Sequence, residues 1–194
     1  MKRIVLVLLV ACGGGGDDKP VDASSTDGTS SDAAIDAPVG GTFTLTSPML
    51  TAGAMFDAAN TCNGANTSPQ LVWSAGPAGT MSYAVVFTDK SNNLVHWVIY
   101  DIPASATGLP ANVEKAYLPN NVTGAKQTLS YQATTRGYLG PCPPVLHTYE
   151  FVVYALDVAT LPGATMATTR AQATQIILAH DLASAALGGM YMQP

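Results

Sequence analysis

Residues 137–151 read GYLGPCPPVLHTYEF and join a stiff loop to a segment with the composition of a strand. The three prolines of this stretch each fix the backbone φ angle and donate no N–H, whereas Gly137 and Gly140 permit backbone angles that other residues avoid. We therefore expect a loop that is rigid and has few amides free to bind.

The strand that follows predicts a fixed position for His147. Residues 148–157 form a nearly continuous apolar and aromatic run of strand length that ends at Asp157. His147 then lies at the mouth of this strand, where binding and catalytic sites are commonly built. The alternative is a hairpin connection in which the histidine only caps the strand.

A second segment places a carboxylate beside another histidine. Residues 82–89 predict a buried strand that ends in Asp89, residues 90–93 form a polar turn, and residues 95–100 predict the returning strand with His96 near its start. Asp89 and His96 are therefore expected at the same end of a sheet, where the carboxylate would orient the ring and raise its pKa. The alternative is that His96, next to Trp97, belongs to the core.

The rest of the folded part is predicted to be mostly β with one helix. The helix is expected over residues 169–187, from a threonine start to the stop at Gly188 and Gly189, with His180 as a core histidine on its apolar stripe. Residues 103–119, rich in Leu-Pro pairs, read as an irregular connection. Further strands are expected at 42–50, 71–73, 82–88, 95–101, 148–157 and 127–132.

Taken in order, these motifs resemble one known family. The CNGANTSP stretch of residues 62–69 precedes Leu71 and Trp73, and Asp89, the His96 segment and the 137–149 segment follow. This order resembles the phosphatidylethanolamine-binding protein family, in its bacterial branch of Raf-kinase-inhibitor-like proteins, over residues 42–194. The resemblance implies a β-sandwich-like fold with a C-terminal helix, and a shallow pocket for an anion such as phosphate or a phospholipid head group.

The resemblance also implies which residues line that pocket, and shows two departures. The family usually reads Asp-Pro-Asp-Ala-Pro where residues 89–93 read DKSNN, so a second carboxylate is replaced by Ser91. It usually reads His-Arg-Tyr where residues 147–149 read HTY, so a cation next to the site is lost. The ligand-binding residues implied are Asp89, His96, Gly140, Pro141, Cys142, Pro143, Pro144, His147 and Tyr149.

The cysteines are explained by the compartment and by the resemblance. If Cys12 carries lipid, Cys62 and Cys142 remain as a pair in an oxidising compartment, and the motifs that carry them lie close together in the family fold. We expect a disulfide between them. The alternative is two buried free thiols, whereas a zinc site lacks any CxxC spacing.

The N-terminal residues predict export and anchoring. Residues 1–12 contain a basic start, a short apolar run and the sequence LVAC, which resembles a bacterial lipoprotein processing box with Cys12 as the lipidated residue. A plain secretory signal, or a start codon assigned too late, is the alternative. Residues 13–41, rich in Gly, Asp and Ser, predict a disordered tether. The expected location is the bacterial cell envelope.

Composition narrows the classes of partner. The chain has 194 residues, enough for one domain. From residue 42 onward it has seven acidic and five basic residues, and the basic residues do not cluster. We therefore do not expect nucleic acid as a partner. Without a Gly-x-Ser-x-Gly motif we expect a binding protein, with no cofactor and no metal, rather than an enzyme. Two alternatives stay open. One is an inhibitor of an envelope protease or another protein partner, and the other is a hydrolase or metal-dependent enzyme that uses Asp89, His96 and His147.

Overall fold

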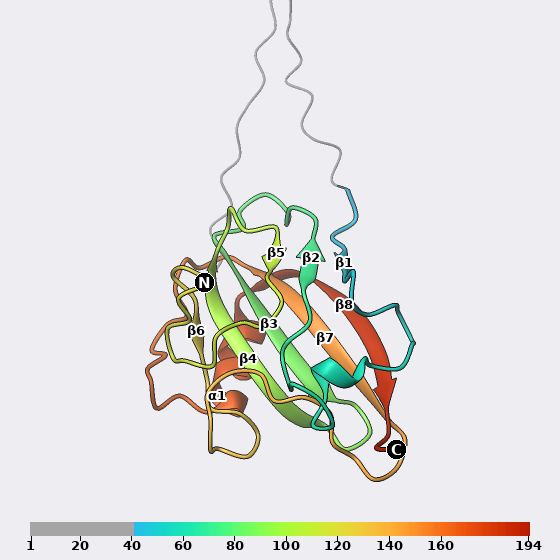
Figure 1. The fold of residues 1–194 in the computed structure, drawn as a ribbon. Helices are drawn as coiled ribbons and strands as arrows, with labels where there is room; N and C mark the ends of the chain where they lie inside the picture. Colours follow the sequence, from blue (N-terminus) through green and yellow to red (C-terminus); the bar gives the residue numbers. More distant parts are fainter. Residues whose placement is uncertain (1–40) are drawn as a thin grey trace, which may run out of the picture. The chain divides into compact units, whose positions relative to one another are not determined.

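The computed structural model describes residues 41–194 (Figure 1), so the predicted signal peptide, Cys12 and all but the last residue of the predicted tether lie outside the described residues. No helix within residues 41–194 has the length and apolar character needed to cross a membrane. The elements are β1 (Leu45–Thr46), a 3-10 turn η1 (Ala58–Asn60), β2 (Leu71–Trp73), β3 (Ser82–Asp89), β4 (Leu94–Pro103), β5 (Gly108–Leu109), β6 (Lys126–Gln127), β7 (His147–Leu156), α1 (Arg170–Ala179) and β8 (Asp181–Tyr191).

The strands form two antiparallel sheets. The larger sheet has the order β6-β4-β3-β7-β8, and the smaller one has the order β1-β2-β5. β3 is the central strand, and it pairs with β7 along its whole length, from Ser82 opposite Leu156 to Asp89 opposite Tyr149. The end of β3 is therefore tied to the beginning of β7.

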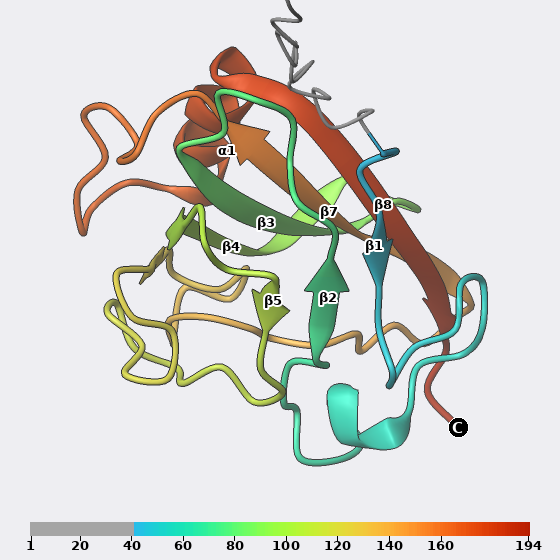
Figure 2. The same ribbon diagram turned by 90° about the horizontal axis from the view of Figure 1, so that it is seen from above.

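Both faces of β3 are buried, which makes the domain a layered structure. Successive side chains of a strand point to opposite faces. Val85 and Phe87 accordingly join the core beneath the smaller sheet, whereas Ala84 and Val86 join a second core beneath α1. Figure 2 shows α1 on one side of the larger sheet and β1, β2 and β5 on the other. The predicted mostly β, sandwich-like fold with a helix near the C-terminus is confirmed.

The helix is shorter than predicted. A capping box at Thr169 and Gln172 begins α1, but His180 has a non-helical φ of −119°, and β8 starts directly after it. The prediction of a helix over 169–187 is therefore wrong for residues 181–187. Alanine-rich residues favour a helix locally, but here they pair with β7 from Leu156 opposite Asp181 to His147 opposite Tyr191. Tertiary pairing overrides the local preference.

Other predicted boundaries also change. His180 is not a core residue: it ends α1 at the surface, and its Nδ1 lies 2.8 Å from Asp157 Oδ1. The strand expected over 42–50 shrinks to β1, and the strand expected over 127–132 shrinks to β6. The irregular connection over 103–119 contains the short strand β5. The three long hydrophobic strands and β2 lie where the sequence predicts them.

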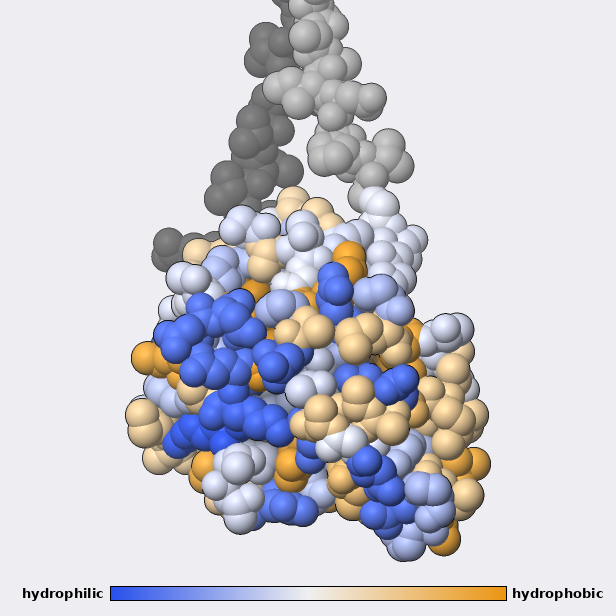
Figure 3. All heavy atoms as spheres, in the orientation of Figure 1, coloured by the Kyte–Doolittle hydropathy of each residue, from blue (hydrophilic) through white to orange (hydrophobic). Residues whose placement is uncertain are grey.

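The surface of the domain mixes polar and apolar side chains. In the view of Figure 3, hydrophilic and hydrophobic residues are interspersed, and no single apolar area covers that face. This agrees with a composition in which only 11% of the residues are charged.

An aromatic cluster supports the large sheet and predicts a large effect of one truncation. The ring of Phe87 stacks on that of Phe151 at 4.2 Å between centroids and is fully buried. Phe87→Ala is expected to lower the free energy of unfolding by about 3–5 kcal/mol, as measured by urea denaturation. Leu182→Ala, at a side chain that is 43% exposed, is the control and should change it by less than about 0.5 kcal/mol. Similar losses for both variants would contradict this account of the core.

Candidate functional site

Three chain segments bring the predicted polar residues to one end of the large sheet. β3 ends at Asp89, β4 carries His96 two residues after its start, and β7 begins at His147. The turn over residues 90–93 is closed by Asn93, whose φ of 59° is a conformation that asparagine tolerates better than most residues. Antiparallel pairing on both sides of β3 thus places the three side chains together.

The tightest polar contact of this site joins Asp89 to His147. The Oδ2 atom of Asp89 lies 2.6 Å from Nδ1 of His147, and the Asp89 side chain is only 3% exposed. An ionised carboxylate can only accept hydrogen bonds, so Nδ1 of His147 carries the proton and donates. The remaining ring nitrogen, Nε2, is left for the pocket. The negative charge of Asp89 also adds to burial in raising the pKa of Tyr149.

His96 has a different partner from the one the sequence suggests. Its Nδ1 atom lies 3.0 Å from the carbonyl oxygen of Leu139, which can only accept, so this ring too carries its proton on Nδ1. Its ring also contacts Tyr131, with 4.2 Å between centroids. Burial lowers the pKa of His96, and the opposing effects of the Leu139 carbonyl and of Asp89 are smaller. Asp89 therefore raises the pKa of His96 as expected, but burial outweighs this effect and the net shift is downward. The expectation that Asp89 orients this ring is wrong, because the Leu139 carbonyl holds its Nδ1.

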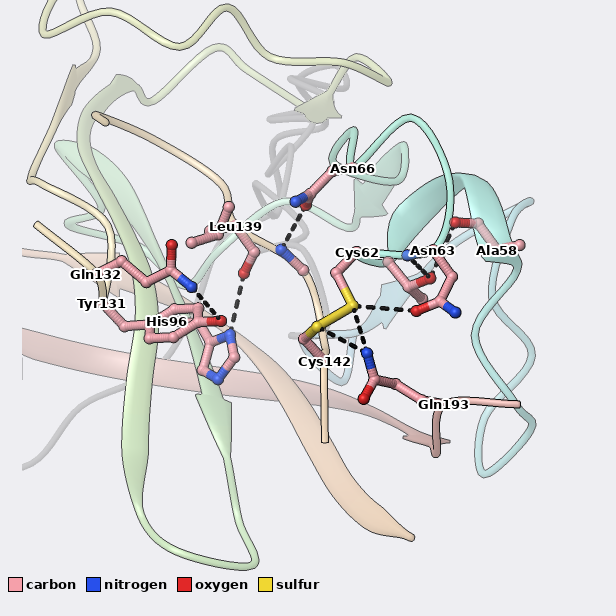
Figure 4. Close-up of a disulfide and its surroundings, with 12 residues drawn as sticks. Ala58, Cys62, Asn63, Asn66, His96, Tyr131, Gln132, Leu139, Cys142 and Gln193 are labelled. Atoms are coloured by element: carbon pink, nitrogen blue, oxygen red, sulfur yellow. Dashed lines mark hydrogen bonds between the residues drawn. A yellow bond between two sulfur atoms is a disulfide. The ribbon is translucent and has the colours of Figure 1, made fainter. Parts of the chain in front are cut away.

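A disulfide fixes the loop that forms the pocket wall. Cys62 and Cys142 are bonded, as expected, and close a loop with a sequence separation of 80 residues. Figure 4 shows the side-chain amide of Gln193 next to both sulfur atoms, with Nε2 at 3.4 Å from Cys62 and 3.2 Å from Cys142. The backbone N–H of Gln193 donates to the carbonyl of Pro143 at 3.0 Å. The C-terminal residues therefore hold the proline loop in place.

Gly140 explains how the loop comes so close to the η1 region. Its N–H donates to Oδ1 of Asn66 at 2.7 Å, and a Cβ atom added at this glycine would lie 2.1 Å from the carbonyl oxygen of Asn60. Only glycine allows this approach. The N–H of Cys62 likewise donates to the carbonyl of Pro141. Gly140 and Pro141 thus support the wall from behind.

Most of the predicted residues line one small pocket, with a volume of about 210 Å³. Gly140 and Pro141 are not among the lining residues, and the sequence did not point to Asn92, Leu94 and Tyr131 as part of it. Asn92 and Leu94 could have been found from their position in the turn between Asp89 and His96, whereas Tyr131 comes from a loop without a sequence signal. The lining residues are Asp89, Asn92, Leu94, His96, Tyr131, Cys142, Pro143, Pro144, His147 and Tyr149.

The first departure from the family pattern, Ser91, has a structural role here. Oγ of Ser91 accepts a hydrogen bond from the N–H of Thr148 at 3.0 Å, and the N–H of Ser91 donates to Oδ1 of Asp89 at 2.9 Å. Lys90 reaches away from the pocket and lies 3.5 Å from Glu150. Ser91 therefore ties β3 to β7 without adding a charge.

The geometry does not bring together the metal ligands that a metal-dependent enzyme would need. Within residues 41–194, no three His, Cys, Asp or Glu side chains are arranged to hold a metal ion. Asp89, His96 and His147 line one pocket but do not form a 2-His-1-carboxylate set. What the arrangement presents is two imidazole rings in one pocket, one bonded through Nδ1 to Asp89 and the other through Nδ1 to the Leu139 carbonyl.

The fold and this pocket define a class of protein. The sequence model of the phosphatidylethanolamine-binding protein family matches residues 46–192. The chain belongs to this family.

Individual relatives support the assignment. "Putative lipoprotein LppC" of Mycobacterium tuberculosis is 34% identical over 198 residues, which cover 96% of this chain and 91% of LppC. A UPF0098 protein of Methanothermobacter thermautotrophicus is 38% identical over 138 residues, covering 68% of this chain and 86% of that protein. The crystal structure of Escherichia coli YbcL, a member of the same family, matches with a TM-score of 0.72 at 29% identity, over 79% of this chain and 100% of that chain.

Loss of the disulfide should weaken the fold measurably. Replacing both Cys62 and Cys142 by alanine is expected to lower the free energy of unfolding by roughly 4 kcal/mol, because the unfolded chain regains the entropy of an 80-residue loop. Urea denaturation with and without a thiol reductant measures the effect. The reductant should destabilise the native chain but not the double variant, and equal sensitivity of the two would contradict the prediction.

The lowered pKa of His96 predicts a dependence of stability on pH. In the unfolded chain this ring takes up a proton at about pH 6.5, whereas the folded protein keeps it neutral to a lower pH. The unfolded state then binds more protons, so the free energy of unfolding falls as the pH drops below about 6.5. His96→Gln should make this fall smaller in urea titrations at several pH values. An unchanged or steeper fall in the variant would show that His96 is not the source of this pH dependence.

Proposed function

We propose that this chain is an envelope-anchored binding protein whose pocket takes a small anion such as a phosphate group. The observation that carries the proposal is the pair of imidazoles in one pocket, each with Nδ1 bonded to an oxygen and Nε2 left over. When protonated, both Nε2 atoms become donors. Charge-assisted hydrogen bonds from such donors suit a phosphate oxygen.

The size of the pocket agrees with a compact ligand. A volume of about 210 Å³ is below the range of roughly 300–1,000 Å³ of drug-sized sites. The proline loop contributes few N–H donors, and its wall is fixed by the disulfide. The two histidines are therefore the groups expected to hold the anion, with Asp89 keeping the ring of His147 in position.

Anion binding in this pocket should be linked to proton uptake. Burial keeps His96 neutral at neutral pH, and a neutral ring with its proton on Nδ1 presents a lone pair at Nε2. A lone pair repels an anion, so the ring must first take up a proton. Affinity is therefore expected to rise as the pH falls below about 6.5.

We also propose that the site binds without catalysing a reaction. Cys142, the cysteine of the pocket wall, is bonded to Cys62 and cannot attack a substrate as a thiolate. His147 donates to Asp89 as in catalytic dyads, but none of the lining residues is a serine, threonine or free cysteine beside it. The arrangement therefore supports a pocket that holds its ligand.

The anchoring and the compartment rest on three observations. The sequence LVAC ending at Cys12 has the form of a lipoprotein processing box. The similarity to LppC, whose name describes a lipoprotein, extends over 96% of this chain. The Cys62–Cys142 disulfide fits an oxidising compartment. Together they support a lipid-anchored domain on the outer side of a bacterial membrane.

Calorimetric titration with sulfate tests the pocket, because sulfate keeps its charge across the relevant pH range. The native chain is expected to bind it roughly tenfold more tightly at about pH 5 than at about pH 7.5, because His96, whose pKa burial lowers, must take up a proton before its Nε2 can donate. His147→Gln and His96→Gln should each abolish most of this gain. His180→Gln is the matched control, because His180 pairs with Asp157 and does not line the pocket.

Two results would overturn the proposal. If the native chain binds neither sulfate nor phosphate at the lower pH, the pocket is not an anion site. If it binds sulfate with an affinity that is the same at both pH values, the imidazoles are not the donors.

A further inference from the structure

The last strand of the large sheet has an outer edge that is only partly covered. β8 pairs with β7 on one side and is the outermost strand of the sheet (Figure 1). On its other side, the N–H of Gly53 donates to the carbonyl of Gly188 at 2.8 Å. The N–H of Met190 likewise donates to the carbonyl of Ala54 at 2.8 Å. The segment before η1 therefore covers the C-terminal end of β8.

The edge is open further up the strand, at Ser184 and Ala186. Backbone groups of alternate residues in an antiparallel strand point to the same side, so these two residues turn their N–H and C=O groups outward, as Gly188 and Met190 do. Within residues 41–194, no group forms a hydrogen bond with these outward groups. β1 contacts β8 from the smaller sheet, but its ladder hydrogen bonds go to β2. Ser184 and Ala186 are both exposed, so their outward backbone groups face water.

This edge also lacks the features that usually keep a sheet edge from pairing. Natural edge strands are protected by a lysine, a proline, a bulge or a very short length. Residues 182–187 read LASAAL, without a charge or a proline, and the register shift of β8 lies before Ala183. The opposite edge strand of the sheet, β6, has only two residues. β8 is therefore the edge that can accept another strand.

The open groups of β8 match those of a second β8 strand. In an antiparallel pair about a two-fold axis at Ala185, Ser184 of one copy lies opposite Ala186 of the other. Residues opposed in this way exchange two hydrogen bonds, so the two opposed pairs use every outward N–H and C=O of both copies. Serine and alanine are small and uncharged, so the side chains at the axis neither clash nor repel.

Charge does not oppose this association. The one charged residue of β8, Asp181, lies at the start of the strand and away from the axis. Residues 42–194 carry seven acidic and five basic side chains, which gives a net charge of 5 − 7 = −2. Repulsion between two copies is therefore weak, and salt screens it further.

We infer that the outer edge of β8 is an interface between two copies of this chain. β8 pairs with β8 of the second copy, antiparallel about a two-fold axis at Ala185, and the two five-stranded sheets become one continuous sheet. The anion pocket lies at the other end of β8, where Tyr191 is opposite His147, so the interface does not depend on the proposed ligand. Because the copies share one strand edge, the dimer forms reversibly.

Sedimentation equilibrium of the full chain tests the association. The native chain of 19.9 kDa is expected to shift from monomer toward dimer between roughly 1 µM and 1 mM. Ser184→Pro removes an outward N–H but no hydrogen bond to β7, so the domain should fold and dimerise at least about tenfold more weakly. Ala186→Lys leaves the backbone unchanged and should weaken the dimer similarly, because two lysines then lie on neighbouring strands at the axis.

Ser184→Thr is the matched control. Threonine keeps the outward N–H and favours a strand, so this variant should dimerise like the native chain. Urea denaturation of each variant shows whether the domain is folded.

Cysteine cross-linking tests the position of the axis. At the axis, the two Ala185 residues form a non-hydrogen-bonded pair with Cα atoms about 4.5 Å apart, which is within the range of a disulfide. Ala185→Cys is made together with Cys12→Ser, so that its thiol is the only free one beside the bonded Cys62 and Cys142. Mild oxidation should then give a covalent dimer. Ala183→Cys, on the same face of the strand but away from the axis, is the control and should stay uncross-linked.

Three results would overturn the inference. If the native chain stays monomeric over the whole concentration range, no second copy occupies the edge, and an extended peptide of another protein is its remaining partner. If Ser184→Pro and Ala186→Lys dimerise as well as the native chain, the interface lies elsewhere. If Ala183→Cys cross-links in preference to Ala185→Cys, the proposed axis is wrong.

Discussion

The antiparallel pairing of β3 with β7 is the constraint on which the rest of the domain depends. It runs without a register shift from Ser82 opposite Leu156 to Asp89 opposite Tyr149. Because the side chains of β3 alternate between two buried faces, this pairing holds the smaller sheet on one side and α1 on the other. It also brings the carboxylate at the end of β3 to the histidine at the start of β7. A shift by one residue would turn the apolar side chains toward the wrong core and separate the two polar groups.

The burial of the Asp89 carboxylate costs free energy, and its hydrogen bond to His147 offsets part of that cost. Taking a carboxylate out of water costs several kcal/mol unless its hydrogen bonds are satisfied. Asp89 meets this condition with the Ser91 amide and the His147 ring, and the amide comes from the turn itself. Ser91 in turn accepts from Thr148, so the turn, the carboxylate and β7 form one connected polar unit. His147 is thus both a structural partner and a candidate ligand contact, which is why its removal must be compared with that of His96, whose partner is a neutral carbonyl.

The sequence could predict the parts of the fold in which local pattern and tertiary structure agree. The long strands around Val85, Trp97 and Phe151 are apolar runs bounded by polar turns, and they lie where expected. Residues 181–187 could not be read correctly, because their alanines favour a helix and only pairing with β7 makes them a strand. At the site, the order of motifs indicated Asp89 and both histidines, but not which histidine bonds the carboxylate. That choice depends on the β3–β7 register and on the Leu139 carbonyl, neither of which leaves a signal in residue types.

The disulfide and the two histidines are connected through one short loop. Residues 139–144 supply the carbonyl that fixes His96, the cysteine that bonds Cys62, and the prolines that close the pocket. A loop with few N–H groups cannot itself form an anion cradle from its backbone, so its contribution is to hold rings and exclude water. Burial lowers the pKa of His96, and this loop shares in that burial with the rings of Phe87, Tyr131 and Tyr149. The loop therefore contributes both to the rigid wall and to the proton dependence expected of the site.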